Sequence, residues 1–343
     1  IRVETLSVNT AAVTGSGSGT LGDGVSDVSF EARLDNLARF VPGFPGAVSA
    51  NGFVSQNTRN SDYSVSFAAV GPGGIQAEAA GTAATDLSTV NIGISGNAPL
   101  EVANRFIAPR AVSGQAVFNL RVAGPPALNS VSGTVTASNG RFSAPNLGIA
   151  LSDIAARVGL SSGTANIDAS AAAVGGGTLQ ANGSLGLSGN FPANLGITLG
   201  SVRLQDPELY ETSVDGTVEI DGPMTGGARI SGALTLNETE LRIPSTGLTG
   251  TGDIPDLIHV DEPTAVRATR ARAGLISSGQ STSGGGGAAY PLDLTINAPG
   301  RIFLRGRGMD AELGGNIRLL GSTAQIIPSG GFQLIRGRLD ILG

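Results

Sequence analysis

The feature that most constrains the fold is an alternation of apolar and polar residues in the segment Arg301–Gly343. Its apolar residues recur at every second position in three short runs: Ile302 and Leu304; Met309, Ala311 and Leu313; and Ile317 and Leu319. Glycines or a Pro-Ser-Gly-Gly sequence separate the runs. A period of two between turn residues predicts antiparallel strands with one buried face.

The final run of this segment changes its parity. Phe332 and Leu334 share one parity, whereas Ile335, Leu339 and Ile341 share the other. Because a slip of one residue exchanges the two faces of a strand, this change predicts a β-bulge or a twist near Leu334.

The same pattern extends back through the chain. Between Ala111 and Pro244, short apolar runs recur about every ten to fifteen residues, and 53 of the 343 residues are glycine. Connections this short join neighbouring antiparallel strands, and glycine lets a sheet bend sharply. We therefore predict an all-β fold, in which one elongated, curved antiparallel sheet forms a groove with a few short helices.

Helical spacing is confined to short segments. We expect short helices near 34–41 and 100–107, each leading into a new set of strands, and a third near 263–273. The alternation is lost between Pro255 and Tyr290, where glycine and serine dominate. The predicted organisation is an N-terminal β-groove repeat (1–95), a central β-groove (96–258), a flexible linker (259–290) and C-terminal strands (291–343).

Composition excludes several classes of function. The chain has no Cys, so it has neither disulfides nor a thiol nucleophile, and only 4% of its residues are aromatic, which disfavours nucleic-acid binding. The single histidine, His259, lies near Asp256, Asp261 and Glu262, but we expect a polar loop there because a metal site needs about four fixed ligands. We expect no enzyme activity, cofactor or metal.

Charge is divided unevenly along the chain. Residues 1–260 contain 12 Arg and 21 acidic residues, a net charge of −9, whereas residues 261–343 contain 9 Arg and 6 acidic residues, a net charge of +3. A basic end on an acidic body attracts an acidic partner or anionic headgroups. For so small a surplus, a solvated strand face is the simpler interpretation.

Two stretches carry a resemblance to a known family. RIFLRGRGMDAELGGNIRL, followed by GGFQLIRGRLDILG, and the upstream stretch Leu209–Pro244 resemble the C-terminal domain of the TamB family, from the translocation and assembly module of Gram-negative bacteria. The match covers about the last 250 residues. The resemblance implies a curved, taco-like sheet with an apolar groove, similar to lipid carriers of the AsmA class.

The resemblance also implies a cellular role. TamB proteins have an N-terminal inner-membrane anchor, so we expect this chain to be a periplasmic fragment of an anchored protein. The family assists assembly of outer-membrane proteins such as autotransporters, and phospholipid transport is attributed to it. Its partner is TamA, an outer-membrane barrel of the BamA type. Expected cargoes are phospholipid acyl chains or nascent outer-membrane β-strands.

Two sets of residues follow as candidates. An apolar groove suited to acyl chains is expected to be lined by Val218, Ile220, Ile230, Leu234, Leu236, Ile302 and Leu304. The alternation alone also fits a self-packed sandwich or solenoid, and the alternative function is a secreted β-solenoid adhesin or passenger domain. Docking to the barrel partner is expected at the terminal strands, through Arg301, Arg305, Arg307, Phe332, Leu334, Arg336, Arg338, Leu339 and Ile341.

Overall fold

A single sheet of 18 strands makes up the chain in a computed structural model that describes residues 2–21, 26–39, 45–56, 61–145, 148–206, 208–244 and 289–340. The first nine strands are β1 (Arg2–Asn9), β2 (Val13–Leu21), β3 (Ser26–Leu34), β4 (Val48–Gln56), β5 (Tyr63–Val70), β6 (Gln76–Ala83), β7 (Val90–Pro99), β8 (Ala111–Gly124) and β9 (Val131–Ala144). The other nine are β10 (Ile149–Ser161), β11 (Thr164–Ala173), β12 (Thr178–Gly186), β13 (Pro192–Asp206), β14 (Tyr210–Pro223), β15 (Arg229–Arg242), β16 (Leu292–Gly306), β17 (Met309–Ser322) and β18 (Gln325–Leu339).

Each strand pairs with the strand that follows it in the chain, so the sheet is a meander with β1 and β18 at its edges. This confirms the predicted elongated, curved sheet, and it differs from the stacked rungs of a solenoid. One pairing departs from the antiparallel prediction, because β15 and β16 are parallel. A parallel pair requires a connection that returns from the end of the first strand to the start of the second, and residues 243–291 separate β15 from β16.

Helices are few and short. The 3₁₀ turns are η1 (Leu37–Arg39), η2 (Pro72–Gly74), η3 (Leu100–Ala103) and η4 (Leu128–Ser130), and the single α-helical turn is α1 (Asn104–Ile107). Helical turns are thus found at η1 and at η3–α1, as predicted for 34–41 and 100–107. The helix expected near 263–273 lies outside the described residues. Among those residues, no helix has the length and apolarity to cross a membrane.

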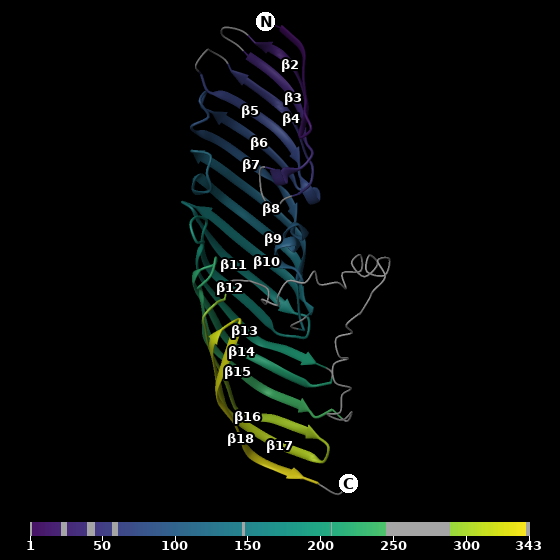
Figure 1. Cartoon of the computed structure of the whole chain (residues 1–343), viewed down its shortest axis with the longest axis vertical. Coiled ribbons are helices and arrows are strands. Elements are labelled where there is room, and N and C mark those ends of the chain that lie inside the picture. Colours follow the sequence, from purple (N-terminus) through teal and green to yellow (C-terminus); the bar gives the residue numbers. More distant parts are fainter. Residues whose placement is uncertain are drawn as a thin grey trace, which may run out of the picture.

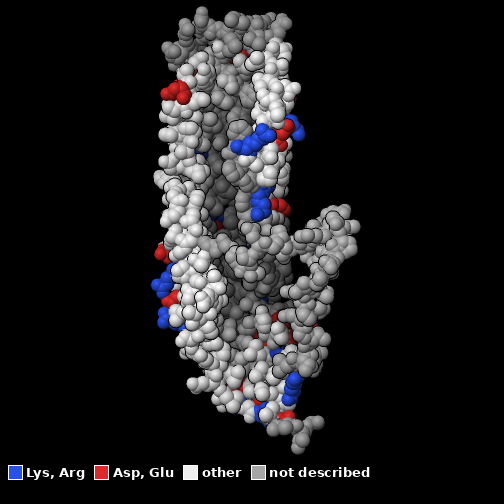
Figure 2. Space-filling model, viewed as in Figure 1, with Lys and Arg blue, Asp and Glu red and all other residues white. Residues whose placement is uncertain are grey.

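The sheet curls into a long trough with the two chain termini at opposite ends (Figure 1). Viewed from the same side, the surface is hollowed along its length (Figure 2). Apart from the short helical turns, the described chain supplies no second layer to cover either face. Within the described part of the chain, the side chains that point into the trough are therefore shielded by the curvature of the sheet and by one another.

Glycines on the inner face permit this curvature. Gly52 of β4 lies opposite Phe30 of β3 and Phe67 of β5 on the same face. A Cβ atom on Gly52 would lie 2.6 Å from the Cα atom of Phe67, well inside van der Waals contact. Gly216 of β14 has a φ of 140°, and a Cβ atom there would lie 2.9 Å from the Cα atom of Leu234. Neighbouring strands come this close on the concave side because these positions lack side chains.

The bulge predicted near Leu334 is confirmed. Pairing between β17 and β18 shifts where Glu312 faces Arg336 and Leu313 faces Leu334, so Ile335 is the extra residue. Beyond the bulge, Leu339 faces Met309, which is on the same face as Leu313. The bulge thus returns the odd-numbered apolar residues to the inner face after the even-numbered Phe332 and Leu334.

Glycine at an inner position is expected to matter more than glycine at an outer one. Gly52→Ala should lower the free energy of unfolding by about 1–3 kcal/mol, since the added Cβ forces the strands apart. Gly159→Ala in β10 is the matched control, because a Cβ there meets nothing within 4 Å. Urea denaturation followed by circular dichroism measures both, and equal losses would contradict this account of the curvature.

Candidate functional site

The two faces of the sheet differ in chemistry along its whole length. In β3, Val28, Phe30 and Ala32 are partly buried, whereas Asp27 and Glu31 on the alternate positions are exposed. Cross-strand pairing carries each face from strand to strand. The inner row that begins at Phe30 continues through Gly52, Phe67, Ala79, Ile94 and Leu120. The inner face is thus apolar and the outer face is mostly polar.

The structure places all seven predicted groove residues on the inner face. Ile220 pairs with Ile230, and Gly216 pairs with Leu234, so β14 and β15 present these side chains to the same side. The parallel pairing of β15 with β16 sets Leu234 beside Ile296 and Leu241 beside Leu304. The predicted set is therefore Val218, Ile220, Ile230, Leu234, Leu236, Ile302 and Leu304, in one continuous apolar surface.

Bulges in β15 and β16 keep this surface continuous. The register shifts between Thr235 and Thr239 in β15, and between Ala298 and Ile302 in β16. Arg301, in the β16 bulge, has a φ of 66°. Ile296, Ala298 and Ile302 are all even-numbered, and β16 keeps all three on the inner face across its bulge. In β15, by contrast, the parity changes at the bulge: the inner residues are the even-numbered Leu236 before it and the odd-numbered Thr239 and Leu241 after it.

Several inner residues were missed by the sequence analysis. Val202 and Val214 are 3% and 4% exposed, and Leu292 is also buried. Val214 pairs with Val202 on one side and with Leu236 on the other, so it belongs to the same surface. Val214 could have been predicted as an inner residue, because it alternates with Val218 and Ile220 along β14. No such signal existed for Val202, because a register shift separates it from Leu199.

The inner face is most deeply buried across β13 to β16. Ile302 is 1% exposed, and Thr212 and Thr239 are buried beside it. The two threonine hydroxyl groups are 2.7 Å apart and satisfy each other by a hydrogen bond. A buried hydroxyl without a partner would be costly, so this pair keeps the surface compatible with apolar neighbours.

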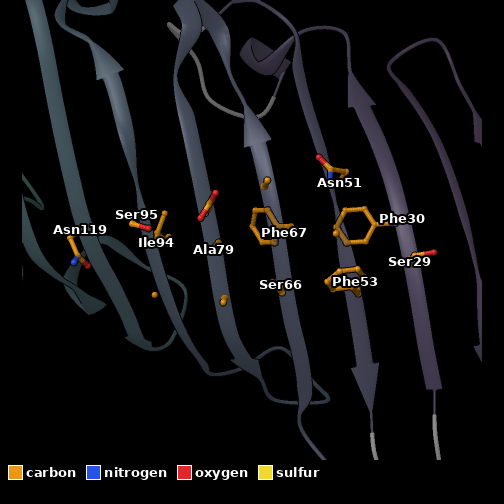
Figure 3. Close-up of a pocket in the computed structure, with 15 residues that line it drawn as sticks. Ser29, Phe30, Asn51, Phe53, Ser66, Phe67, Ala79, Ile94, Ser95 and Asn119 are labelled. Carbon is orange, nitrogen blue, oxygen red and sulfur yellow. The ribbon is translucent and has the colours of Figure 1, made fainter.

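One cavity among the described residues lies elsewhere, on the outer face of β3 to β8. It is a shallow hollow of about 700 Å³. Most of the residues that line it alternate along their strands with the residues of the inner row, so their side chains lie on the opposite face. Among them are Ser29, Asn51, Phe53 and Ser66. Phe53 stands between Ser29 and Ser66 of the adjacent strands (Figure 3). This hollow is therefore separate from the apolar groove.

Ion pairs on the outer face tie the C-terminal strands together. Asp293 of β16 receives hydrogen bonds from Arg318 of β17, with Nε at 2.7 Å, and from Arg229 of β15. These hydrogen bonds lower the pKa of Asp293 to about 2. Glu312 accepts from Arg336 Nε at 2.6 Å and from the backbone N–H of Arg301 at 3.2 Å, and these contacts lower its pKa.

The arginines predicted to dock a partner make contacts within the chain. Arg301 pairs with Glu238, Arg305 with Glu240 and Asp310, Arg336 with Glu312, and Arg338 with Asp340. Arg307 donates from Nε to the carbonyl oxygen of Pro244 at 3.0 Å. The positive charge of this end is thus largely balanced on the outer face, which fits the simpler interpretation of a solvated strand face.

The apolar members of the docking set lie on β18. Phe332, Leu334 and Leu339 are on the inner face, and Leu334 and Leu339 are more than half exposed. Ile341 lies outside the described residues. In the part of the chain that the structure describes, β18 pairs only with β17, so its other edge carries unpaired backbone groups.

Metal-ligating side chains do not cluster in the described part of the chain. No three His, Cys, Asp or Glu side chains there come close enough to hold a metal ion. His259 and its acidic neighbours lie outside the described part. The functional features that remain are the apolar inner face, the rims of the trough and the open edge of β18.

The Asp293 cluster predicts a dependence of stability on pH. The folded-state pKa of about 2 is below the ordinary value of 3.8 for an aspartate, so the contribution to stability is complete above pH 3.8 and is lost as the pH falls towards 2. Asp293→Asn should therefore lower the melting temperature at pH 6 but have little effect near pH 2. A difference between the two proteins that stays constant from pH 6 to pH 2 would contradict the ion-pair role.

Comparison with known proteins identifies the C-terminal half. The family described as TamB C-terminal domain matches residues 166–343, which include β12 to β18 and thus all the candidate residues. No curated protein and no solved structure gives a significant match. Because the matched region covers more than half of the chain and contains the apolar groove, the chain belongs to the TamB family.

Proposed function

We propose that this chain carries phospholipid acyl chains along its apolar inner face towards the outer membrane, as a periplasmic part of a translocation and assembly module. Membership of the TamB family supports a role in outer-membrane assembly or lipid transport and a location in the cell envelope. The observation that supports the finer proposal is the apolar inner row, which continues from strand to strand with no second layer in the described residues to cover it.

The energetics of such a groove suit transport rather than storage. Each buried CH₂ group contributes about 0.8 kcal/mol, so a chain of about 16 carbons gains on the order of ten kcal/mol before ordering costs. Valine, leucine, isoleucine and alanine side chains provide this gain through many similar contacts. Since no directional hydrogen bond from the inner face fixes the position of an acyl chain, the chain is free to slide along the trough.

A charge on the inner face tests the groove. Leu234→Arg places a cation among apolar side chains, where an unpaired charge is costly, and should reduce the amount of bound phospholipid at least several-fold. Thr235→Arg is the matched control, because Thr235 pairs with Asp215 on the outer face. Native mass spectrometry of the purified proteins measures the bound lipid. Equal loss in both variants, or no lipid on the unaltered chain, would exclude a lipid groove here.

A second role, docking to an outer-membrane barrel of the TamA type, rests on the edge of β18. This strand is 15 residues long and its outer edge is open in the described chain, with Ile326, Ile327 and Leu339 exposed. An open edge of this length is a template for strand addition by a partner sheet. The same edge would accept a nascent outer-membrane β-strand during assembly of an autotransporter.

Removal of the edge strand tests this docking. A chain that ends at residue 324 should no longer capture the periplasmic domains of the barrel partner, because the open edge of β18 is gone. Far-UV circular dichroism checks that the remaining strands stay folded. Capture that persists after the deletion would place the docking surface on another part of the chain.

A further inference from the structure

The two rims of the trough are formed by alternate turns, and they differ in charge. Between β8 and β15, the part of one rim here called the uncharged rim consists of the turns at 125–130, 162–163, 187–191 and 224–228, and none of these turns contains a charged residue. The opposite rim contains Glu101, Arg105 and Arg110 around η3 and α1, and Asp206 and Glu208 between β13 and β14. In Figure 2 the middle stretch of the left rim is white between charged residues above and below it, and the right rim shows both signs of charge.

The uncharged rim also exposes large apolar side chains at the tips of its turns. Leu128 is 60% exposed and Phe191 is 40% exposed, and Met224 is exposed in the turn after β14. Leu87 is exposed too, in the turn between β6 and β7 that precedes the uncharged rim on the same side of the trough and contains Asp86. Turns on one rim recur at every second strand, about 10 Å apart, so these tips form a spaced row.

Two of these tips adopt a backbone conformation that their side chains disfavour. Leu87 has a φ of 58° and Phe191 a φ of 52°, where glycine or asparagine is usual. The turn at Phe191 is fixed by its neighbours: its N–H donates to Ser188 O at 3.2 Å, and its carbonyl oxygen accepts from the N–H of Met224 at 3.1 Å. The structure thus holds bulky apolar groups in strained, solvent-exposed positions, which points to a function for them.

We propose that the uncharged rim docks the open side of the trough on the surface of a lipid bilayer. Its tips are separated by Ser, Asn, Thr and Gly, so they do not form the contiguous apolar core that a protein interface requires. A headgroup layer accepts single apolar side chains to a depth of about 5–10 Å, and polar turn residues between them bind headgroups. With no charged group in the three turns that hold Leu128, Phe191 and Met224, insertion has no ionic desolvation cost.

Charges border the uncharged rim at both ends: Asp86 precedes it, and an ion cluster on the outer face follows it. Arg229, Asp293 and Arg318 form the ion cluster described above, and the hydroxyl of Tyr290 donates to the carbonyl oxygen of Met224 at 2.8 Å. The apolar tips therefore define the contact. An acyl chain that leaves such a bilayer would reach the inner face without passing a charged turn, and this second step alone rests on the proposed lipid groove.

Vesicle binding tests the docking with a matched pair of variants. The double variant Leu128→Asp/Phe191→Asp should bind vesicles of pure phosphatidylcholine more weakly by roughly tenfold for each tip. The control is Val174→Asp/Leu209→Asp, which alters two turn residues of the opposite rim that are 67% and 49% exposed. Flotation at low and high salt should show binding that salt does not weaken, since no charge is involved.

A fluorescent reporter gives a second measurement, because the chain contains no Trp. Phe191→Trp should show a blue shift with vesicles and quenching by brominated lipid, whereas Val174→Trp should show neither. No vesicle binding by the unaltered chain, equal loss in both double variants, or self-association through the rim in place of vesicle binding would overturn the proposal. Leu234→Arg, which tests the groove, should still bind vesicles, so failure of one proposal is distinguishable from failure of the other.

Discussion

A single sheet with one apolar face must limit the contact of that face with water, and the described residues supply no second layer to bury it. Exposed apolar area is unfavourable in proportion to its size, so a flat sheet of this composition would aggregate or pair with another. Curling the sheet reduces the water-accessible area of one face. Gly52, opposite Phe30 and Phe67, shows how the sequence permits this, because the large side chains lie over a position with no side chain of its own.

Curling buries the apolar residues only if every strand keeps them on the same side of the sheet. At the bulges, polar groups on the outer face stabilise the backbone that maintains this arrangement. Ser201, in the β13 bulge, has a φ of 50°, and its N–H donates to Asp215 Oδ1 at 2.7 Å. Glu312 receives the N–H of Arg301 from the β16 bulge in the same way. Carboxylates on the outer face thus satisfy backbone groups that a bulge leaves unpaired. These carboxylates therefore stabilise the curved shape of the sheet in addition to keeping its outer face polar.

Much of this was predictable from local sequence. Alternation at Ile302 and Leu304 predicted the strand and placed these two residues on one face, and the change of parity after Leu334 located a bulge that the structure confirms. Two features were not predictable. The parallel pairing of β15 with β16 depends on where a long connection returns, which no local period encodes. The pairing of Arg305 with Glu240 joins residues far apart in sequence, so arginines that looked free for a partner are bound within the sheet.

Shape and chemistry together favour a moving cargo over a fixed ligand. A fixed ligand site is concave and contains a few convergent polar groups that set orientation. Among the described residues, the inner face offers one buried polar pair, Thr212 and Thr239, and its two hydroxyl groups bond to each other and leave the surroundings apolar. Contacts that are numerous, weak and alike give little preference for one position along the trough. The same curvature that shields the apolar face therefore also provides a path of nearly uniform energy for an acyl chain.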